Sequence, residues 1–299
     1  MRKLVGIVVL CVAAAAAFGE EAAVIPEQNL RLSQNEDFGF GDGDFIHSWG
    51  VGAEYGVRDW LNVQFLWNRY LKLLPDIGTG SMFLGVKTYI VGEDALLTTT
   101  GNKFRLSLAL GLLIPPTGET PDFFDQDQNL WGTVFRVYGD FIINQYVYIN
   151  AFYEWDFYPP QYQNDDLAAY RDWVRRYQDY TLEIEGHFRI PLENGFVLKG
   201  GVPFRFFCAP YMNASDGLAT SQYFISTGAY FGIQFPEHSP PGEVYLRYTV
   251  PLIGQNFKQI HRFSIIHKVT LPPELLKLRL RGKTEKTSEG FTFTTNEGE

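Results

Sequence analysis

From about residue 45 onward, the sequence repeats one pattern: about ten residues in which apolar and polar side chains alternate, and then a break. Alternation with a period of two is typical of a β-strand whose two faces meet different surroundings. The clearest example is 104–114, whose apolar face is formed by Phe104, Leu106, Leu108, Leu110, Leu112 and Ile114. Arg105, Ser107, Ala109 and Gly111 form the opposite face.

This pattern predicts an all-β chain of about twelve strands. They are expected at about 24–33, 49–57, 60–70, 82–90, 104–114, 133–142, 146–157, 179–190, 196–207, 223–234, 244–253 and 260–271. The alternation is least regular in 24–33. Most of the others are near the ~9–11 residues with which a tilted strand crosses a bilayer. Pro203 and Pro251 fall inside strands and predict bulges or shortened strands, because proline cannot donate a ladder hydrogen bond.

The connections alternate in length. Tight joins are expected at 58–59, 143–145 and 191–195, and longer ones at about 71–81, 115–132, 158–178 and 208–219. Short turns at one end and long loops at the other are typical of a transmembrane barrel with its short turns in the periplasm. The joins at 91–103 and 235–243 are longer than this rule expects.

The first residues predict export. Arg2 and Lys3 precede an apolar stretch from Leu4 to Phe18, which is shorter than the ~20 residues of a spanning helix. We expect a signal peptide over 1–19, a barrel over 20–271 and a mobile periplasmic tail over 272–299. Without Cys11 the mature chain keeps only Cys208, so it cannot form an internal disulfide.

Composition separates the remaining classes. The net charge of −9 argues against nucleic acid as a partner, and no mature segment is apolar enough for a spanning helix. The chain is 16% aromatic, and we expect aromatic girdles from rings near the strand ends: Trp49, Trp60, Trp67, Tyr70, Trp131, Trp155 and Tyr158. A closed transmembrane antiparallel up-and-down β-barrel in the outer membrane is favoured over a soluble exported β protein.

Three segments resemble the outer-membrane barrels regarded as transporters of the aromatic meta-degradation pathway. Residues 54–61 (EYGVRDWL) resemble that family's tight first hairpin, 84–89 (LGVKTY) its next strand, and 108–118, ending in IPPTG, its exit from the following strand. The likeness covers about 50–120. It implies a barrel of about twelve strands that moves small, often apolar compounds, and it transfers no catalytic residue.

The polar faces of the expected strands carry the candidate lumen-lining residues. These are Glu54, Lys87, Arg105, Arg136, Asp140, Glu154, Glu183, Glu185, His187, Arg189, Lys199, Arg205 and Arg247. They either select solutes, as charges in a narrow lumen do, or form a network that fills the interior. Acids and bases are mixed, so the sequence predicts no strong ion preference.

Residues 164–178 show helical spacing at Leu167, Tyr170, Val174 and Tyr177. This segment is either an ordered surface loop or an extracellular lid that carries Arg171, Trp173, Arg175 and Arg176.

No pattern indicates an enzyme, a metal site or a cofactor. Neither Asp42 and Asp44 nor the acidic residues at 119–127 have calcium-loop spacing, and no G-x-S-x-G element occurs. The expected partners are outer-membrane lipids, the barrel-assembly machinery and an unidentified small solute, with the oligomeric state left open. The sequence therefore predicts a porin-like channel for passive or gated passage of small, including apolar, solutes. The alternative is a structural or adhesive surface barrel with a filled lumen.

Overall fold

The fold was examined in a computed structural model, which describes residues 22–41, 44–72, 77–99, 103–114, 131–158, 174–176, 178–213, 219–236, 242–255, 259–274 and 276. Its strands are β1 (Leu30–Gly41), β2 (Asp44–Arg58), β3 (Leu61–Lys72), β4 (Ile77–Gly92), β5 (Leu97–Thr98), β6 (Phe104–Ile114), β7 (Gly132–Ile142), β8 (Val147–Phe157), β9 (Val174–Arg176), β10 (Gln178–Pro191), β11 (Val197–Asn213), β12 (Ala219–Gln234), β13 (Gly242–Gln255) and β14 (His261–Leu271). In the part of the chain that is described, no helix combines the length and the apolar character needed to cross a membrane.

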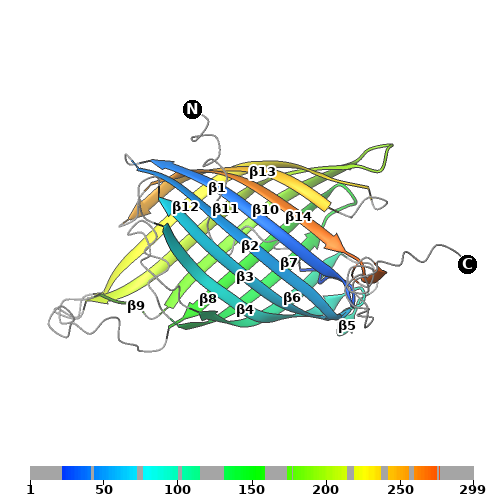
Figure 1. Ribbon diagram of the computed structural model, residues 1–299, viewed down its shortest axis with the longest axis horizontal. Coiled ribbons are helices and arrows are strands. Elements are labelled where there is room, and N and C mark those ends of the chain that lie inside the picture. The colour runs from blue at the N-terminus through cyan, green and yellow to red at the C-terminus, as the bar shows by residue number, and fades with distance from the viewer. Residues whose placement is uncertain are drawn as a thin grey trace, which may run out of the picture.

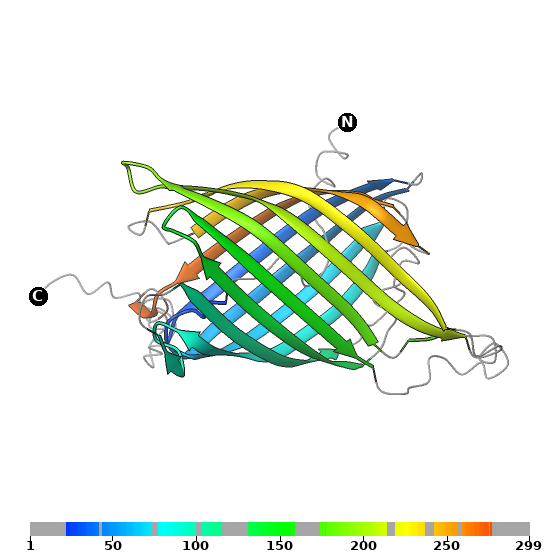
Figure 2. The same ribbon diagram turned by 180° about the vertical axis from the view of Figure 1, so that it is seen from behind.

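Twelve long strands form one closed antiparallel sheet. Each pairs with the long strand before and after it in the chain, and β1 closes the circle on β14 over Leu30–Phe40 and His261–Leu271. The short strand β5 pairs with β4, and β9 pairs with β11. Figures 1 and 2 show the strands tilted around a single barrel. The predicted all-β, up-and-down transmembrane barrel of about twelve strands is confirmed.

The distribution of side chains is the reverse of that in a soluble domain. Many large apolar side chains on the strands are exposed, among them Leu110, Val202 and Phe231, whereas Lys87, Asp140 and Glu183 are almost fully buried. A single closed sheet has only its lumen in which to bury such groups. An apolar outer surface and a polar interior are what a barrel in lipid requires.

The connections define two ends of the barrel. The turn end holds the joins at 59–60, 93–103, 143–146, 192–196 and 235–241, together with the start of β1 and the end of β14. It lies at the right of Figure 1 and at the left of Figure 2. The other end, with the joins at 115–131 and 159–173, is the loop end. In bacterial barrels, short turns are typical of the periplasmic end.

The first strand is displaced from its predicted position. The expected strand at 24–33 is wrong over its first half: β1 begins at Leu30, and the chain before it makes a tight turn at 26–29. Pro26 cannot extend a ladder, and the polar run from Gln34 to Asp37 obscured the alternation of the true strand.

Two of the predicted long joins are short. Strand β3 runs to Lys72 and β4 starts at Ile77, while β11 runs to Asn213 and β12 starts at Ala219. Strand β2 also begins at Asp44, before its predicted start at 49. Trp49 and Trp67 therefore lie inside strands rather than at strand ends, and their rings meet edge to face 6.1 Å apart. Tyr158 is buried and donates to Asp179 Oδ2 at 3.0 Å, so it belongs to the interior and not to a girdle.

The two strand prolines act differently. Beside Pro251 the register of β12 and β13 shifts between Ile225 and Ser226, which confirms the predicted bulge. At Pro203 the pairing of β11 with β12 skips two residues but keeps its register. The Pro203 carbonyl there accepts from Thr227 Oγ1 at 2.9 Å.

The helix predicted over 164–178 is wrong where the structure describes it. Val174–Arg176 is strand β9, which pairs with Tyr211–Asn213, and Gln178 already belongs to β10. The long strand β11 offers a free edge there, and pairing with this edge outweighs helical spacing. Residues 164–173 lie outside the described part of the chain, as do 1–21 and most of the 272–299 tail.

One polar pair occupies the outer face. Gln34 and Glu36 share their face of β1 with the outward Leu32 and Phe40, and Gln34 Nε2 donates to Glu36 Oε1 at 2.8 Å. Glu36 is 9% exposed between its neighbours. The hydrogen bond satisfies part of the carboxylate in surroundings where an unpaired charge is expensive.

The inside-out assignment predicts a depth-dependent effect of arginine on the outer face of β6. Leu110→Arg, at mid-strand, should lower the free energy of unfolding by about 2–4 kcal/mol, and Phe104→Arg, at the turn end, by about 0–1 kcal/mol. Both side chains point outward and are exposed. Urea unfolding in lipid vesicles measures the difference, and equal losses would contradict the assignment.

Candidate functional site

All thirteen predicted lumen residues lie on the inner face. Cross-strand partners share a face, and the register joins these residues to one another, as in Arg105 with Asp140 and Glu183 with Arg205. Arg247 on β13 forms an ion pair with Glu183 on β10, although β11 and β12 lie between these strands. Such a contact can form only through the lumen.

The lumen also contains the chain that precedes β1, here called the inner segment (residues 22–29). The backbone N–H of Ala22 donates to Asp140 Oδ2 at 3.1 Å, and its carbonyl accepts from Ser107 Oγ. Lys87 Nζ donates to the Ala23 carbonyl at 3.2 Å. These inner-face side chains come from β7, β6 and β4, so the segment is held against one side of the barrel wall.

A tight turn at the rim leads the inner segment into β1. The N–H of Asn29 donates to the Pro26 carbonyl at 3.2 Å, and Gln28 has φ 63°, the left-handed value expected at the third position of a type II turn. Gly56 of β2 lies directly beneath: a Cβ there would overlap the carbonyl oxygen of Pro26. Glycine at this position permits the close approach.

The half of the lumen behind the inner segment, walled by β3, β4, β6, β7 and β8, is packed. Ala22 joins Ala109, Tyr138 and Phe152 in one apolar cluster. A second cluster is formed by Leu66, Phe83, Val134 and Leu113.

Charged side chains in this packed half contact an opposite charge or an aromatic ring within the same half. Arg136 pairs with Glu154, with side-chain exposures of 5% and 6%, and its guanidinium lies 3.9 Å from the centre of the Phe83 ring. Lys87 Nζ lies 4.4 Å from the centre of the Tyr138 ring.

The rest of the lumen, here called the hollow half, holds two cavities. The loop-end cavity is walled by β1 and β10–β14, and the turn-end cavity is walled by these strands together with residues of β6–β8 and their turns. The turn-end cavity has a volume of about 610 Å³. Its lining comprises Arg31, Lys103, Arg105, Asp140, Ile142, Ile143, Asn144, Gln145, Tyr148, Arg189, Lys199, Gln234, Gly242, Glu243, Lys268 and Thr270. This volume falls within the range of pockets that hold small molecules.

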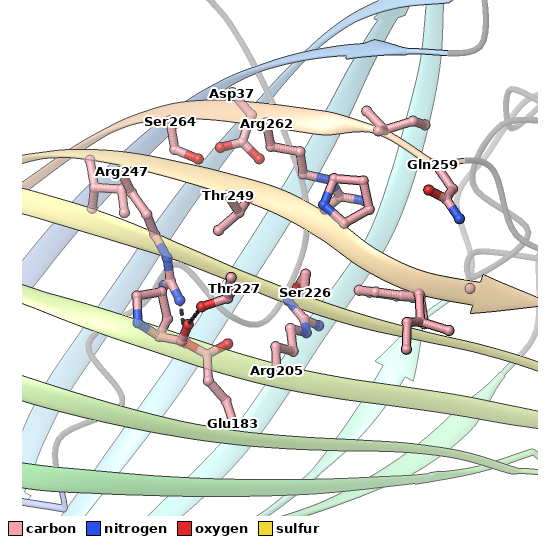
Figure 3. Close-up of a pocket in the computed structure, with 17 residues that line it drawn as sticks. Asp37, Glu183, Arg205, Ser226, Thr227, Arg247, Thr249, Gln259, Arg262 and Ser264 are labelled. Atoms are coloured by element: carbon pink, nitrogen blue, oxygen red, sulfur yellow. Dashed lines mark hydrogen bonds and ion pairs between the residues drawn. The ribbon is translucent and has the colours of Figure 1, made fainter.

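The loop-end cavity is much smaller, about 60 Å³, which is room for a few water molecules. Figure 3 shows Arg205, Arg247 and Arg262 around it, together with Asp37 and Glu183. Arg205 Nε, Asp37 Oδ1 and Glu183 Oε2 are buried there without a hydrogen-bond partner in the described protein. Water or a solute in the cavity can satisfy them.

A ring of contacts separates the two cavities. Arg247 pairs with Glu183 and lies 3.7 Å from Glu185. His187 Nδ1 and the Tyr230 hydroxyl share a hydrogen bond of 2.5 Å, and the imidazole stacks on Tyr148 at 4.3 Å between ring centres. These contacts bring side chains of β8, β10, β12 and β13 together inside the lumen.

Sequence reasoning missed several residues of the site. Arg31 lies in the expected strand at 24–33, whose weak alternation assigned no inner face, and Lys103 lies in a connection. Arg262 and Lys268 lie on the same, inner face of β14, so the period-two alternation of this strand was sufficient to identify them. Ala22 carried no signal, because it acts through its backbone.

Most of the other predicted features lie in residues that the structure does not describe. Arg171 and Trp173 of the predicted lid are among the undescribed residues, whereas Arg175 and Arg176 lie in β9. Acidic residues 119–127 are likewise not described. Among the residues that are, no group of three or more potential metal ligands is found.

The fold and its interior define a closed twelve-stranded β-barrel with a half-packed lumen. No family model and no curated protein matches the sequence. Among solved structures, the chain is similar to an outer membrane channel from Pseudomonas putida F1, with a TM-score of 0.62, 12% identity, and coverage of 87% of this chain and 100% of that one. A NanC porin is matched with a TM-score of 0.46, 10% identity, and coverage of 80% and 100%.

The turn beside Gly56 gives a test of how the inner segment is held. Gly56→Ala should displace the segment, because the added methyl group overlaps backbone rather than a mobile side chain. Amide hydrogen exchange at Ala22 and Gln28 should accelerate roughly tenfold or more, since overpacking costs about 1–3 kcal/mol. Gly186→Ala is the matched control, because its Cβ would meet open space. Equal exchange in both variants would contradict the proposed support.

The buried ion pair of the packed half gives a second test. Arg136→Met leaves Glu154 buried without its partner and should lower the free energy of unfolding by about 3–5 kcal/mol. The double variant Arg136→Met/Glu154→Met should recover most of that loss, because no lone charge remains. Urea unfolding in vesicles measures both, and a double variant as unstable as the single one would show that the charge is not the cause.

Proposed function

We propose that this protein is an outer-membrane channel through which small solutes pass along the hollow half of the lumen. The observation that carries the proposal is the 610 Å³ cavity at the turn end, which the inner segment leaves open beside it. The apolar outer surface supports a place in lipid. The proposed mechanism is diffusion down a gradient.

The second cavity supports a route rather than an isolated pocket. It lies along the same strands, β10 to β14 and β1, nearer the loop end. The ion pair of Arg247 with Glu183 stands between the cavities, and side chains rearrange on timescales that suit a passing solute. A solute would exchange its contacts with Arg205 and Arg262 for contacts with the turn-end cavity.

The class of solute follows from the dimensions. A barrel of twelve strands lies between the filled eight-stranded and the open sixteen-stranded types, and half of this one is packed. Only small molecules fit. Apolar ones are included on the strength of the sequence resemblance to barrels of the aromatic meta-degradation pathway, and the inner segment is the proposed gate.

One observation favours the alternative, a structural or adhesive barrel with a filled lumen. The loop-end cavity of about 60 Å³ is too small for an organic solute without movement of its walls. On this reading the charged network only stabilises the barrel, and function lies in the undescribed loops. The two proposals differ in whether the folded protein carries current.

The route predicts which wall controls conductance. The mature protein in planar bilayers should show discrete currents, and Thr249→Trp should lower the unitary conductance several-fold, because Thr249 lines the loop-end cavity. Leu246→Trp, on the outward face of the same strand, should leave it unchanged. Folded protein that carries no current would favour the filled barrel. Equal conductance in Thr249→Trp and Leu246→Trp would contradict a route past Thr249.

A further inference from the structure

Basic side chains are in excess around the turn-end cavity, although acids and bases look mixed in the sequence. Around the turn-end cavity the structure gathers six basic and two acidic side chains. The basic ones are Arg31, Lys103, Arg105, Arg189, Lys199 and Lys268, and the acidic ones are Asp140 and Glu243. The chain as a whole has a net charge of −9. This cavity is therefore a local exception to an acidic protein.

The two acids do not neutralise the excess. Lys199 Nζ lies 2.6 Å and Lys268 Nζ 3.5 Å from the Glu243 carboxylate, so two cations share one anion. Asp140 accepts from Asn150 Nδ2 at 2.9 Å and from the Ala22 N–H, and it stands opposite Arg105 in the register. Outside the cavity wall, Glu54 faces Arg31 at 3.5 Å, which still leaves cations in the majority.

One cross-strand pair places two basic side chains beside each other. Arg189 of β10 and Lys199 of β11 are directly opposite each other on the inner face. Like charges in that relation are destabilising. The folded protein thus maintains two neighbouring cations at a cavity large enough for a small molecule, a combination that an anion in the cavity would stabilise.

Neutral polar groups complete the lining. Asn144, Gln145 and Gln234 carry amide donors at the rim, and Tyr148 carries a hydroxyl. Guanidinium and ammonium groups beside such donors are the usual partners of carboxylate and phosphate oxygens.

We propose that the turn-end cavity binds small anions, organic carboxylates among them, and gives the channel an anion preference. The preference rests on the proposed channel function, whereas the binding does not. Excess positive charge in a confined, low-dielectric space raises the local anion concentration and excludes cations. The turn end would thus hold solute anions at the periplasmic mouth.

The test is a pair of measurements on the mature protein. Reversal potentials in planar bilayers under a tenfold KCl gradient give the chloride-to-potassium permeability ratio, and calorimetric titration of citrate into the detergent-folded barrel at low salt gives anion binding. Wild type should prefer chloride and bind citrate. Arg189→Glu should lower the permeability ratio by roughly two- to fourfold, the effect of two charge units on a monovalent ion at about 10 Å in water with salt screening. The affinity for citrate, which carries about three charges, should fall by a larger factor, roughly fivefold or more.

Arg58→Glu is the matched control. It reverses one charge at the same end, but Arg58 does not line the cavity, and its ion pair with Glu27 is exposed and so contributes little to stability. The chloride-to-potassium permeability ratio and the citrate affinity of Arg58→Glu should match those of the wild type.

The outcomes separate this inference from the channel function. A conducting protein that prefers potassium, or for which Arg189→Glu and Arg58→Glu behave alike, overturns the inference and leaves the channel standing. A protein without current whose citrate binding is weakened by Arg189→Glu alone supports the anion site and overturns the channel. Absence of both current and citrate binding overturns both.

Discussion

Closure of β1 on β14 is the contact on which the rest of the molecule depends. Backbone N–H and C=O groups in lipid have no water to pair with, so a sheet can stand there only when it has no edge. Twelve strands satisfy this by pairing in a ring, and the ring fixes a lumen of limited width. Every inward side chain must then find its partner inside that space. The ion pairs of Arg136 with Glu154 and Arg247 with Glu183 are consequences of closure.

The inner segment divides this limited space unequally. Its backbone bonds to Lys87, Ser107 and Asp140 hold it against one wall, where aromatic and aliphatic side chains complete the packing. The loop-end cavity lies along the strands on the other side, and the turn-end cavity, with its surplus of arginine and lysine, is lined from both sides. Residues 22–29, which precede the first strand, therefore narrow the described part of the lumen. The same residues also set where charge can gather.

Much of the fold could be predicted from the sequence, because period-two alternation directly records a sheet with lipid on one side. The thirteen lumen residues on the inner face follow from the same pattern, as Arg105 opposite Asp140 illustrates. The pattern failed where other forces decide. The polar run at Gln34 to Asp37 hid β1, and pairing with the edge of β11 overrode the helical spacing that ends in Val174 and Tyr177.

Alternation cannot reveal how side chains meet across the lumen. The register of twelve strands sets which charges share a level of the barrel, and that register is a property of the closed ring. Hence the grouping of Arg31 with Arg189 and Lys268, which come from three separate parts of the sequence, was not predictable. The inner segment was equally hidden, because Ala22 and Ala23 bind through backbone atoms that every residue has.

The most direct test of a half-packed lumen is the reactivity of single cysteines toward a charged, water-soluble thiol reagent. In a chain whose Cys208 is replaced by serine, Thr249→Cys samples the hollow wall, Ala109→Cys the packed wall and Leu110→Cys the outer face. The structure predicts rapid modification of Thr249→Cys alone in protein reconstituted in vesicles. Comparable rates at Thr249→Cys and Ala109→Cys would contradict the division of the lumen, and rapid modification of Leu110→Cys would contradict the inside-out barrel itself.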